Sequence, residues 1–320
     1  MRGGQIPEFD SKSQMSHNRT EFDCYLIVDW SASARPKTKR DSVWYCVLTR
    51  KTGGATLPQS YNPPTRIKAI EEIGKILADC SQRRVPTLVG FEFPYGYPSG
   101  FANALGLTGK PPWRAVWDAI TARIEDHEDN RNDRFETAAE FNGKVSGGPF
   151  PFWGCPLNRQ STTLTSRKVH PFSAGTLLEY RLSDRRAKAK GAQSVWKLLG
   201  PGSPGSQALL GIPYVAKLRA DPRFDKVSRV WPFETGLRRL ACRKQRGWII
   251  LHAEIFPSLL PFRPRPGEIR DQAQVRNLAE QFAGLDERGE LGKLFDRPAG
   301  IMDEECQIVE SEEGWILGIR

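Results

Sequence analysis

One continuous apolar run near the start of the chain most constrains what it can fold into. Residues 24–29 read Cys-Tyr-Leu-Ile-Val-Asp, and they are apolar up to the last position, Asp29. A run of this length without polar alternation indicates a strand that is covered on both faces. A carboxylate at the end of such a strand loses hydration and needs a partner. Because strand ends line the ligand crevice of open α/β sheets, Asp29 is a candidate functional residue. A purely structural carboxylate that accepts backbone N–H groups is the alternative.

The segments that follow predict a particular order of elements. Helical spacing of apolar residues predicts one helix from Thr65 to Cys80 and another from Arg270 to Leu285. Apolar, aromatic and β-branched runs predict strands at residues 24–29, 42–48, 56–61, 87–94 and 248–256. The predicted order is three strands, a helix, a strand, a long insertion, a strand and a helix. This is the order of a ribonuclease H-like fold. We therefore expect an α/β protein whose mixed sheet has the order 3-2-1-4-5, with helices on both faces.

Composition favours one globular domain. The 320 residues are 39% hydrophobic, which excludes a disordered chain. We expect a disordered tail at 1–20 and a single domain at 21–320, with a loop-rich or helical insertion at about 100–245. The tail has no apolar run and therefore predicts no signal peptide. No stretch approaches the roughly 20 apolar residues of a membrane span. The six cysteines form no CxxC pair, so reduced thiols and a cytoplasmic location are expected.

A net charge of +10 predicts attraction to an anionic partner, and nucleic acid (DNA or RNA) is the obvious candidate. The basic residues concentrate at 214–246, where only three acidic residues oppose ten basic ones. A charge that serves only solubility is the alternative. The charge therefore suggests a partner class without identifying it.

Two more acidic residues end predicted strands. Glu92 ends the fourth strand, and Gly90 leaves room on the same face. Its structural alternative is a cap on the following Pro94 turn. Glu254 shares a face of the fifth strand with His252, which could serve as a proton shuttle or form a buried pair with it.

Asp271 begins the last predicted helix and precedes Val275 by one helical turn. An acid on the inward face of a first turn is either a ligand or an N-cap, and Asp is a favoured N-cap. If the acidic residues meet at one crevice, divalent cations must neutralise them. Oxygen ligands favour Mg²⁺ or Mn²⁺, and we expect Asp29, Glu92 and Asp271 to hold the metal. The expected catalytic residues are Asp29, Glu92, Glu254 and Asp271.

Several motifs resemble the DUF429 family. They are residues 25–32 (Tyr-Leu-Ile-Val-Asp-Trp-Ser-Ala), 90–98, 196–200, 205–211, 254–259 and 271–276, and the resemblance covers about 23–320. This is a family of uncharacterised proteins described as predicted nucleases of the ribonuclease H fold. The resemblance implies that Asp29, Glu92, Glu254 and Asp271 occupy the family's acidic motif positions. Glu92 departs from the Asp that many such sequences have there in an Asp-Ile-Pro-like motif.

The insertion then becomes a candidate substrate-facing segment. Arg181 and Lys197 belong to a basic stretch that could contact phosphates. Ser206 and Gln207 follow a Gly/Ser-rich loop whose backbone N–H groups could cradle a phosphate, although it matches no P-loop pattern. Trp153 and Trp196 could stack bases. A solvated basic face and core tryptophans are the structural alternatives.

Three functions remain open from the sequence. The first is a metal-dependent nuclease or phosphodiesterase, a hydrolase in which divalent ions support phosphodiester cleavage. The second is a protein that binds or transfers a nucleotide or a phosphorylated metabolite, since related folds serve many functions. The third is a nucleic-acid-binding scaffold without catalytic activity.

Overall fold

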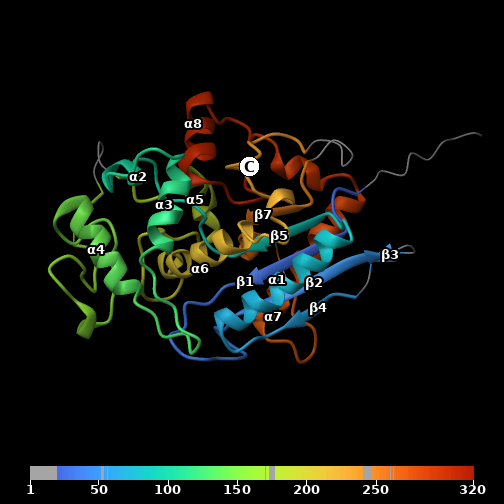
Figure 1. Ribbon diagram of the computed structural model, residues 1–320, viewed down its shortest axis with the longest axis horizontal. Coiled ribbons are helices and arrows are strands. Elements are labelled where there is room, and N and C mark those ends of the chain that lie inside the picture. Colours follow the sequence, from blue (N-terminus) through green and yellow to red (C-terminus); the bar gives the residue numbers. More distant parts are fainter. Residues whose placement is uncertain are drawn as a thin grey trace, which may run out of the picture.

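The parallel strands β1, β5 and β7 form the centre of the molecule in a computed structural model (Figure 1). The structure describes residues 20–320 except 52–53, 56, 170, 173–176, 241–246, 260 and 262. Within these residues a seven-stranded sheet has the order β3-β2-β1-β5-β7-β6, and β4 also pairs with β2. The expected α/β class with a mixed sheet is therefore confirmed. The expected disordered tail and Cys242 lie outside the described residues.

Each predicted strand corresponds to one observed strand, and the third, at 56–61, corresponds to the short strand at residues 59–61. Two further short strands, at residues 54–55 and 228–230, were not predicted. The strands are β1 (Cys24–Asp29), β2 (Trp44–Lys51), β3 (Gly54–Ala55), β4 (Gln59–Tyr61), β5 (Thr87–Phe91), β6 (Ser228–Val230) and β7 (Ile250–Glu254).

The described helices are more numerous than the two that were predicted. Both predicted helices are present as α1, which Thr65 caps by accepting the Lys68 N–H, and α7. The helices are α1 (Arg66–Gln82), α2 (Phe101–Ala104), α3 (Pro112–Thr121), α4 (Arg134–Ser146), α5 (Leu182–Ala187), α6 (Pro204–Arg219), α7 (Arg270–Glu287) and α8 (Asp303–Ile308).

The strand order differs from the expected 3-2-1-4-5 at the edges of the sheet. β1 pairs antiparallel with β2 and parallel with β5, and β5 pairs parallel with β7. β6 continues the sheet beyond β7 in parallel orientation. The short β6 escaped prediction because three residues carry too little alternation to be distinguished from a loop.

Two hydrophobic clusters cover the faces of the sheet. On one face, Leu26 and Val28 of β1 belong to the same cluster as residues of α1 and α6. On the other face, Tyr25 and Ile27 join residues of α7 and of the C-terminal segment 315–319. The alternation along β1 thus assigns each side chain to one helical layer. No described helix has the length and apolar character that crossing a membrane requires.

Helix α6 is the main element that the sequence did not reveal. It lies in the part of the chain with poor periodicity, and it contains Pro213 in its interior. Its buried residues surround most of the helix, so no polar face produces the usual amphipathic pattern. Gly211 permits the close packing of α6, because a Cβ there would lie 2.3 Å from the Phe93 ring. This packing brings the N-terminal end of α6 beside the strand ends.

Candidate functional site

Asp29 and Glu92 lie next to each other at the ends of two parallel strands. Val28 is paired with Phe91 in the β1–β5 ladder, and the Glu92 N–H donates to the Val28 carbonyl at 3.0 Å. The next residue on each strand is therefore the acid. Because paired residues project from the same face, both carboxylates extend toward the side of the sheet that α7 covers. The sequence prediction brought these two residues together correctly.

The two carboxyl groups perturb each other strongly. Burial raises the pKa of Asp29 well above its ordinary value, and the negative charges of Glu92, Asp271 and Asp41 raise it further. Burial also raises the pKa of Glu92 to about 7, although a hydrogen bond with Asp29 opposes this. A hydrogen bond between two carboxyl groups requires a proton on one of them. The raised pKa values mean that the pair binds a proton more readily than isolated carboxyl groups do, and a bound cation would compete with that proton.

Asp271 approaches the pair from the first turn of α7. Its Oδ2 accepts the backbone N–H of Asp41 at 2.7 Å. The N-cap residue of α7 is Ile269, so the N-cap alternative for Asp271 is wrong. Burial raises the pKa of Asp271 as well. Asp41, in the loop after β1, adds a fourth acid that sequence reasoning missed, since a single loop acid carries no pattern.

A polar hollow of about 750 Å³ opens above these residues. Asp29, Glu92 and Asp271 line it together with residues of the loop after β1 and of the segment 198–207. Four basic side chains also line it, namely Lys37, Arg134, Lys190 and Arg270. The hollow thus combines acids on strand ends with cations from four different segments, which suits a ligand that carries phosphate groups.

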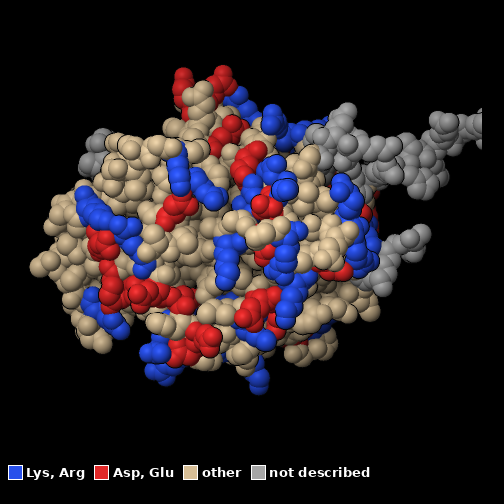
Figure 2. All heavy atoms as spheres, in the orientation of Figure 1, with Lys and Arg blue, Asp and Glu red and all other residues tan. Residues whose placement is uncertain are grey.

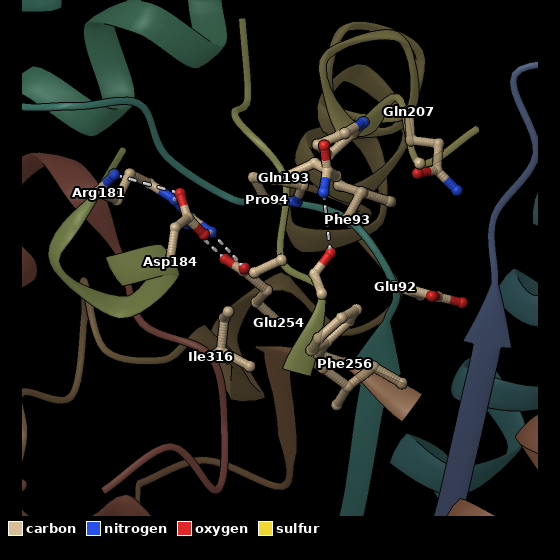
Figure 3. A pocket seen from close by; sticks show the side chains of 15 residues that line it. Glu92, Phe93, Pro94, Arg181, Asp184, Gln193, Gln207, Glu254, Phe256 and Ile316 are labelled. Atoms are coloured by element: carbon tan, nitrogen blue, oxygen red, sulfur yellow. Dashed lines mark hydrogen bonds and ion pairs between the residues drawn. The ribbon is translucent and has the colours of Figure 1, made fainter. Parts of the chain in front are cut away.

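A smaller pocket of about 110 Å³ adjoins the hollow (Figure 3). The two share five lining residues, which are Glu92, Gly191, Gly202, Gln207 and Phe256. The other residues of the small pocket are mostly apolar, among them Phe93, Pro94, Ala192, Ile255 and Ile316. Sequence reasoning did not detect this pocket, because its walls come from six separate stretches of the chain.

Glu254 does not join the carboxylate pair, contrary to the sequence prediction. It is paired with Phe91 in the β5–β7 ladder and therefore projects from the face opposite to Glu92. Both Glu254 oxygens accept from Arg181, at 2.6 and 2.7 Å, and one also accepts the Tyr95 N–H. Figure 3 shows Glu92 and Glu254 projecting in different directions. Glu254 is thus a buried ion-pair partner and not a member of the acidic cluster.

Arg181 is likewise a structural residue, which corrects its assignment to substrate binding. The side chain is fully buried. Its guanidinium donates to Asp184, to Glu254 and to the Glu313 carbonyl, so its donors are engaged within the protein. Burial opposes the charge, but Asp184 and Glu254 hold the pKa of Arg181 well above its ordinary value. The buried guanidinium of Arg181 is therefore not accessible to a phosphate group from solution.

His252 does not pair with Glu254. Its Nε2 lies 2.9 Å from the Ser228 hydroxyl, and the residue is fully buried. Burial lowers the pKa of His252 to about 3, so the ring is neutral at physiological pH. The suggested buried His–Glu pair is therefore wrong, and the role of proton shuttle stays a prediction.

The other predicted substrate-binding residues lie beside the hollow but are engaged in local contacts. The Lys197 ammonium donates to the Pro201 carbonyl at 2.7 Å. The buried Ser206 hydroxyl donates to the Leu198 carbonyl and accepts from Arg134. Of these residues, Ser206 and Gln207 line the hollow.

Gln207 and Ser206 connect α6 to its surroundings. The Gln207 amide donates to the Trp30 carbonyl at 2.6 Å and thereby links α6 to the loop after β1. The residue before them is Gly205. A side chain is excluded at this position, because a Cβ would lie 2.3 Å from the Val195 carbonyl oxygen. The Gly-Ser-Gln motif therefore positions one wall of the hollow.

Neither tryptophan named as a stacking candidate faces the hollow. Trp196 is fully buried among Tyr97, Phe101 and Phe152. Trp153 is partly buried against the same cluster. The structural alternative, core tryptophans, therefore holds for both.

The donor set fits a divalent cation with few protein ligands. Among the described residues, no group of three or more His, Cys, Asp or Glu side chains is arranged to hold a metal ion. Mg²⁺ is typically bound through one or two carboxylates, with waters and substrate phosphates completing its shell. Asp29 and Glu92 are the two carboxylates that could serve as such ligands, and the negative charge of Asp271 raises the pKa of both. No family model, curated protein or solved structure matches the chain.

Proposed function

We propose that the protein is a metal-dependent phosphodiesterase or nuclease. One observation supports this function above all, namely the adjacent carboxyl groups of Asp29 and Glu92 at the floor of a hollow that four basic side chains line. Acids alone would repel a phosphodiester, and basic residues alone would only bind it. Together with a divalent cation, the two sets of residues can hold and polarise it.

The chain's own residues would divide the chemistry as follows. Asp29 and Glu92 would hold Mg²⁺ or Mn²⁺, which supplies Lewis acidity at the phosphoryl oxygen. Arg134, whose pKa burial lowers to about 10, stays charged and would orient the phosphate. Water adds to phosphorus while the bond from phosphorus to the leaving ester oxygen breaks, and the water proton ends on that oxygen. The products are a phosphomonoester and an alcohol.

The same proposal includes the fold family. The antiparallel β2–β1 pair followed by parallel β5 and β7, with acids at the ends of β1 and β5, supports a ribonuclease H-like core. The resemblance to DUF429 motifs agrees with it for Asp29, Glu92 and Asp271, but Glu254 has the structural role described above. A nucleic-acid partner and a cytoplasmic location belong to the same proposal.

The distribution of charge on the visible face favours recognition at the hollow over recognition along that face. On the face shown in Figure 2, Lys and Arg side chains are interspersed with Asp and Glu and form no continuous basic patch. A long duplex bound along such a face would meet both signs of charge. The basic residues of the hollow are therefore the best candidates for phosphate contacts.

Hydrolysis assays with purified protein test the proposal. We expect cleavage of DNA or RNA oligonucleotides with Mg²⁺ or Mn²⁺, and loss of cleavage with EDTA. Asp29→Asn should reduce the rate by about 100-fold or more, because the loss of an outer-shell partner of a metal site already costs about 10- to 100-fold. Asp79→Asn is the matched control, because Asp79 is an exposed acid of α1 that forms an ion pair with Arg83. A wild-type protein that cleaves neither polymer with either metal would exclude the nuclease.

A binding protein for a phosphorylated metabolite is the second candidate. The concave hollow with separate cations favours it, because such a site also suits a single small phosphate ester. It predicts binding of the ligand without metal-dependent turnover, and the assays above separate the two. A nucleic-acid-binding scaffold without activity would bind oligonucleotides equally with and without EDTA.

A further inference from the structure

The small pocket beside Glu92 has the size of one ring. Its volume is about 110 Å³, which is less than the about 150 Å³ of a cavity that holds a benzene molecule, so the pocket has room for no more than one ring. The aromatic rings of Phe93 and Phe256 and the apolar side chains of Pro94 and Ile316 line it. The amides of Gln193 and Gln207 are the uncharged polar side chains in its lining. A planar, apolar ring with polar edges matches this combination.

The pocket opens beside the carboxylate pair. Glu92, Gln207 and Phe256 belong to the lining of both the pocket and the hollow. A group in the small pocket is therefore adjacent to a phosphate held in the hollow. Three charged residues of the lining, Arg181, Asp184 and Glu254, are paired with one another and offer no contact to a phosphate. The two compartments thus differ in chemistry while sharing a boundary.

We propose that the small pocket binds one unpaired, single-ring base of the nucleotide whose phosphate lies in the hollow. This inference rests on the proposed function and specifies its substrate as single-stranded nucleic acid. A base inside a duplex is stacked and paired, so it reaches such a pocket only when it is unpaired or extruded. Stacking on an aromatic side chain and a phosphate contact together are how proteins hold single strands.

Binding of mononucleotides tests the pocket without any catalysis. We expect cytidine 5′-monophosphate to bind at least tenfold more tightly than ribose 5-phosphate, measured by calorimetry and thermal shift on the metal-free protein. Phe256→Ala should remove most of this difference, because it removes the ring against which the base stacks. The control is Leu157→Ala, which removes a side chain that is 77% exposed and lines neither compartment. Equal affinity of the wild-type protein for the two ligands, or binding of neither, would overturn the inference even if Phe256→Ala failed to fold.

Cleavage assays separate this inference from the proposed function. We expect single-stranded pyrimidine oligonucleotides to be cleaved faster than the same sequence in a duplex, and an abasic site to slow cleavage at its own position. If the cleavage rate were the same for paired, unpaired and abasic substrates, the base pocket would be excluded, and the proposed hydrolase activity would be retained. Base-dependent binding without any cleavage would support the pocket and exclude the hydrolase.

Discussion

In the β5–β7 ladder Glu254 is paired with Phe91, the residue that precedes Glu92. This offset of one residue decides the roles of the two acids. Successive side chains of a strand project to opposite faces, so Glu92 joins Asp29 on one face and Glu254 meets Arg181 on the other. One acid is thereby available to a ligand, and the other is part of the core.

The first prediction concerns the buried ion pair. Arg181→Met should destabilise the protein by about 3–5 kcal/mol, because Glu254 and Asp184 would then be buried without their cation. Urea denaturation measures the change. Arg185→Met is the matched control, since Arg185 belongs to the same short helix and is exposed. If Arg181 bound substrate instead, its variant would lose activity at unchanged stability.

The sequence was sufficient for the central part of the fold. β1 and β5 are apolar on both faces, and the helical periodicity of α1 and α7 is clear, so these four elements could be predicted. The same elements carry Asp29, Glu92 and Asp271. Helix α6 could not be predicted, because Pro213 and an apolar surface on most sides conceal its period.

The site could be predicted only in part, for a related reason. The end of a strand can be read from a sequence, but the register between two strands cannot. A shift of one residue would have placed Glu254 beside Glu92. The partners of Arg181 come from β7, from α5 and from the C-terminal segment, and no local pattern indicates that they meet.

The second prediction concerns the pH dependence of stability in the metal-free protein. The pKa of Glu92 is raised from 4.5 to about 7, and that of Asp29 is raised as well, so the folded state binds a proton more tightly than the unfolded chain. The free energy of unfolding should therefore fall as the pH rises from about 4.5 to about 7. Thermal melts in EDTA across this range measure the effect.

Asp29→Asn tests the origin of that pH dependence. The variant removes one negative charge from the pair, so it should be more stable than the wild type at pH 8, by about 1–3 kcal/mol. At pH 5 the two proteins should differ little, because the wild-type pair is then protonated. The exposed Asp79→Asn substitution should leave the pH profile unchanged. A wild-type profile that stays flat over this range would show that the two carboxyl groups do not share a proton.

The third prediction concerns the packing of α6. Gly211→Ala should destabilise the protein by about 1–3 kcal/mol, since the new methyl group would overlap the Phe93 ring. Gly143→Ala in α4 is the control, because its nearest neighbour would be 3.6 Å away. That change should instead stabilise the protein by up to about 1 kcal/mol, the difference in helix propensity. Adding Phe93→Leu to Gly211→Ala should restore part of the loss. Chemical denaturation of the three variants and the wild type measures these changes.

The fourth prediction concerns competition between metal and proton. A metal ligand must be deprotonated, so Mn²⁺ binding at Asp29 and Glu92 should strengthen as the pH rises through about 7, the pKa of Glu92. A ligand at 100 times its dissociation constant stabilises a protein by about 2.7 kcal/mol. We therefore expect Mn²⁺ to raise the melting temperature more at pH 8 than at pH 6. The increase should be absent in Asp29→Asn and smaller in Asp271→Asn, which removes only the more distant charge. If Mn²⁺ raised the melting temperature of the wild type and of Asp29→Asn equally, the ion would bind elsewhere. Its binding would then be independent of the charge and the protonation of Asp29.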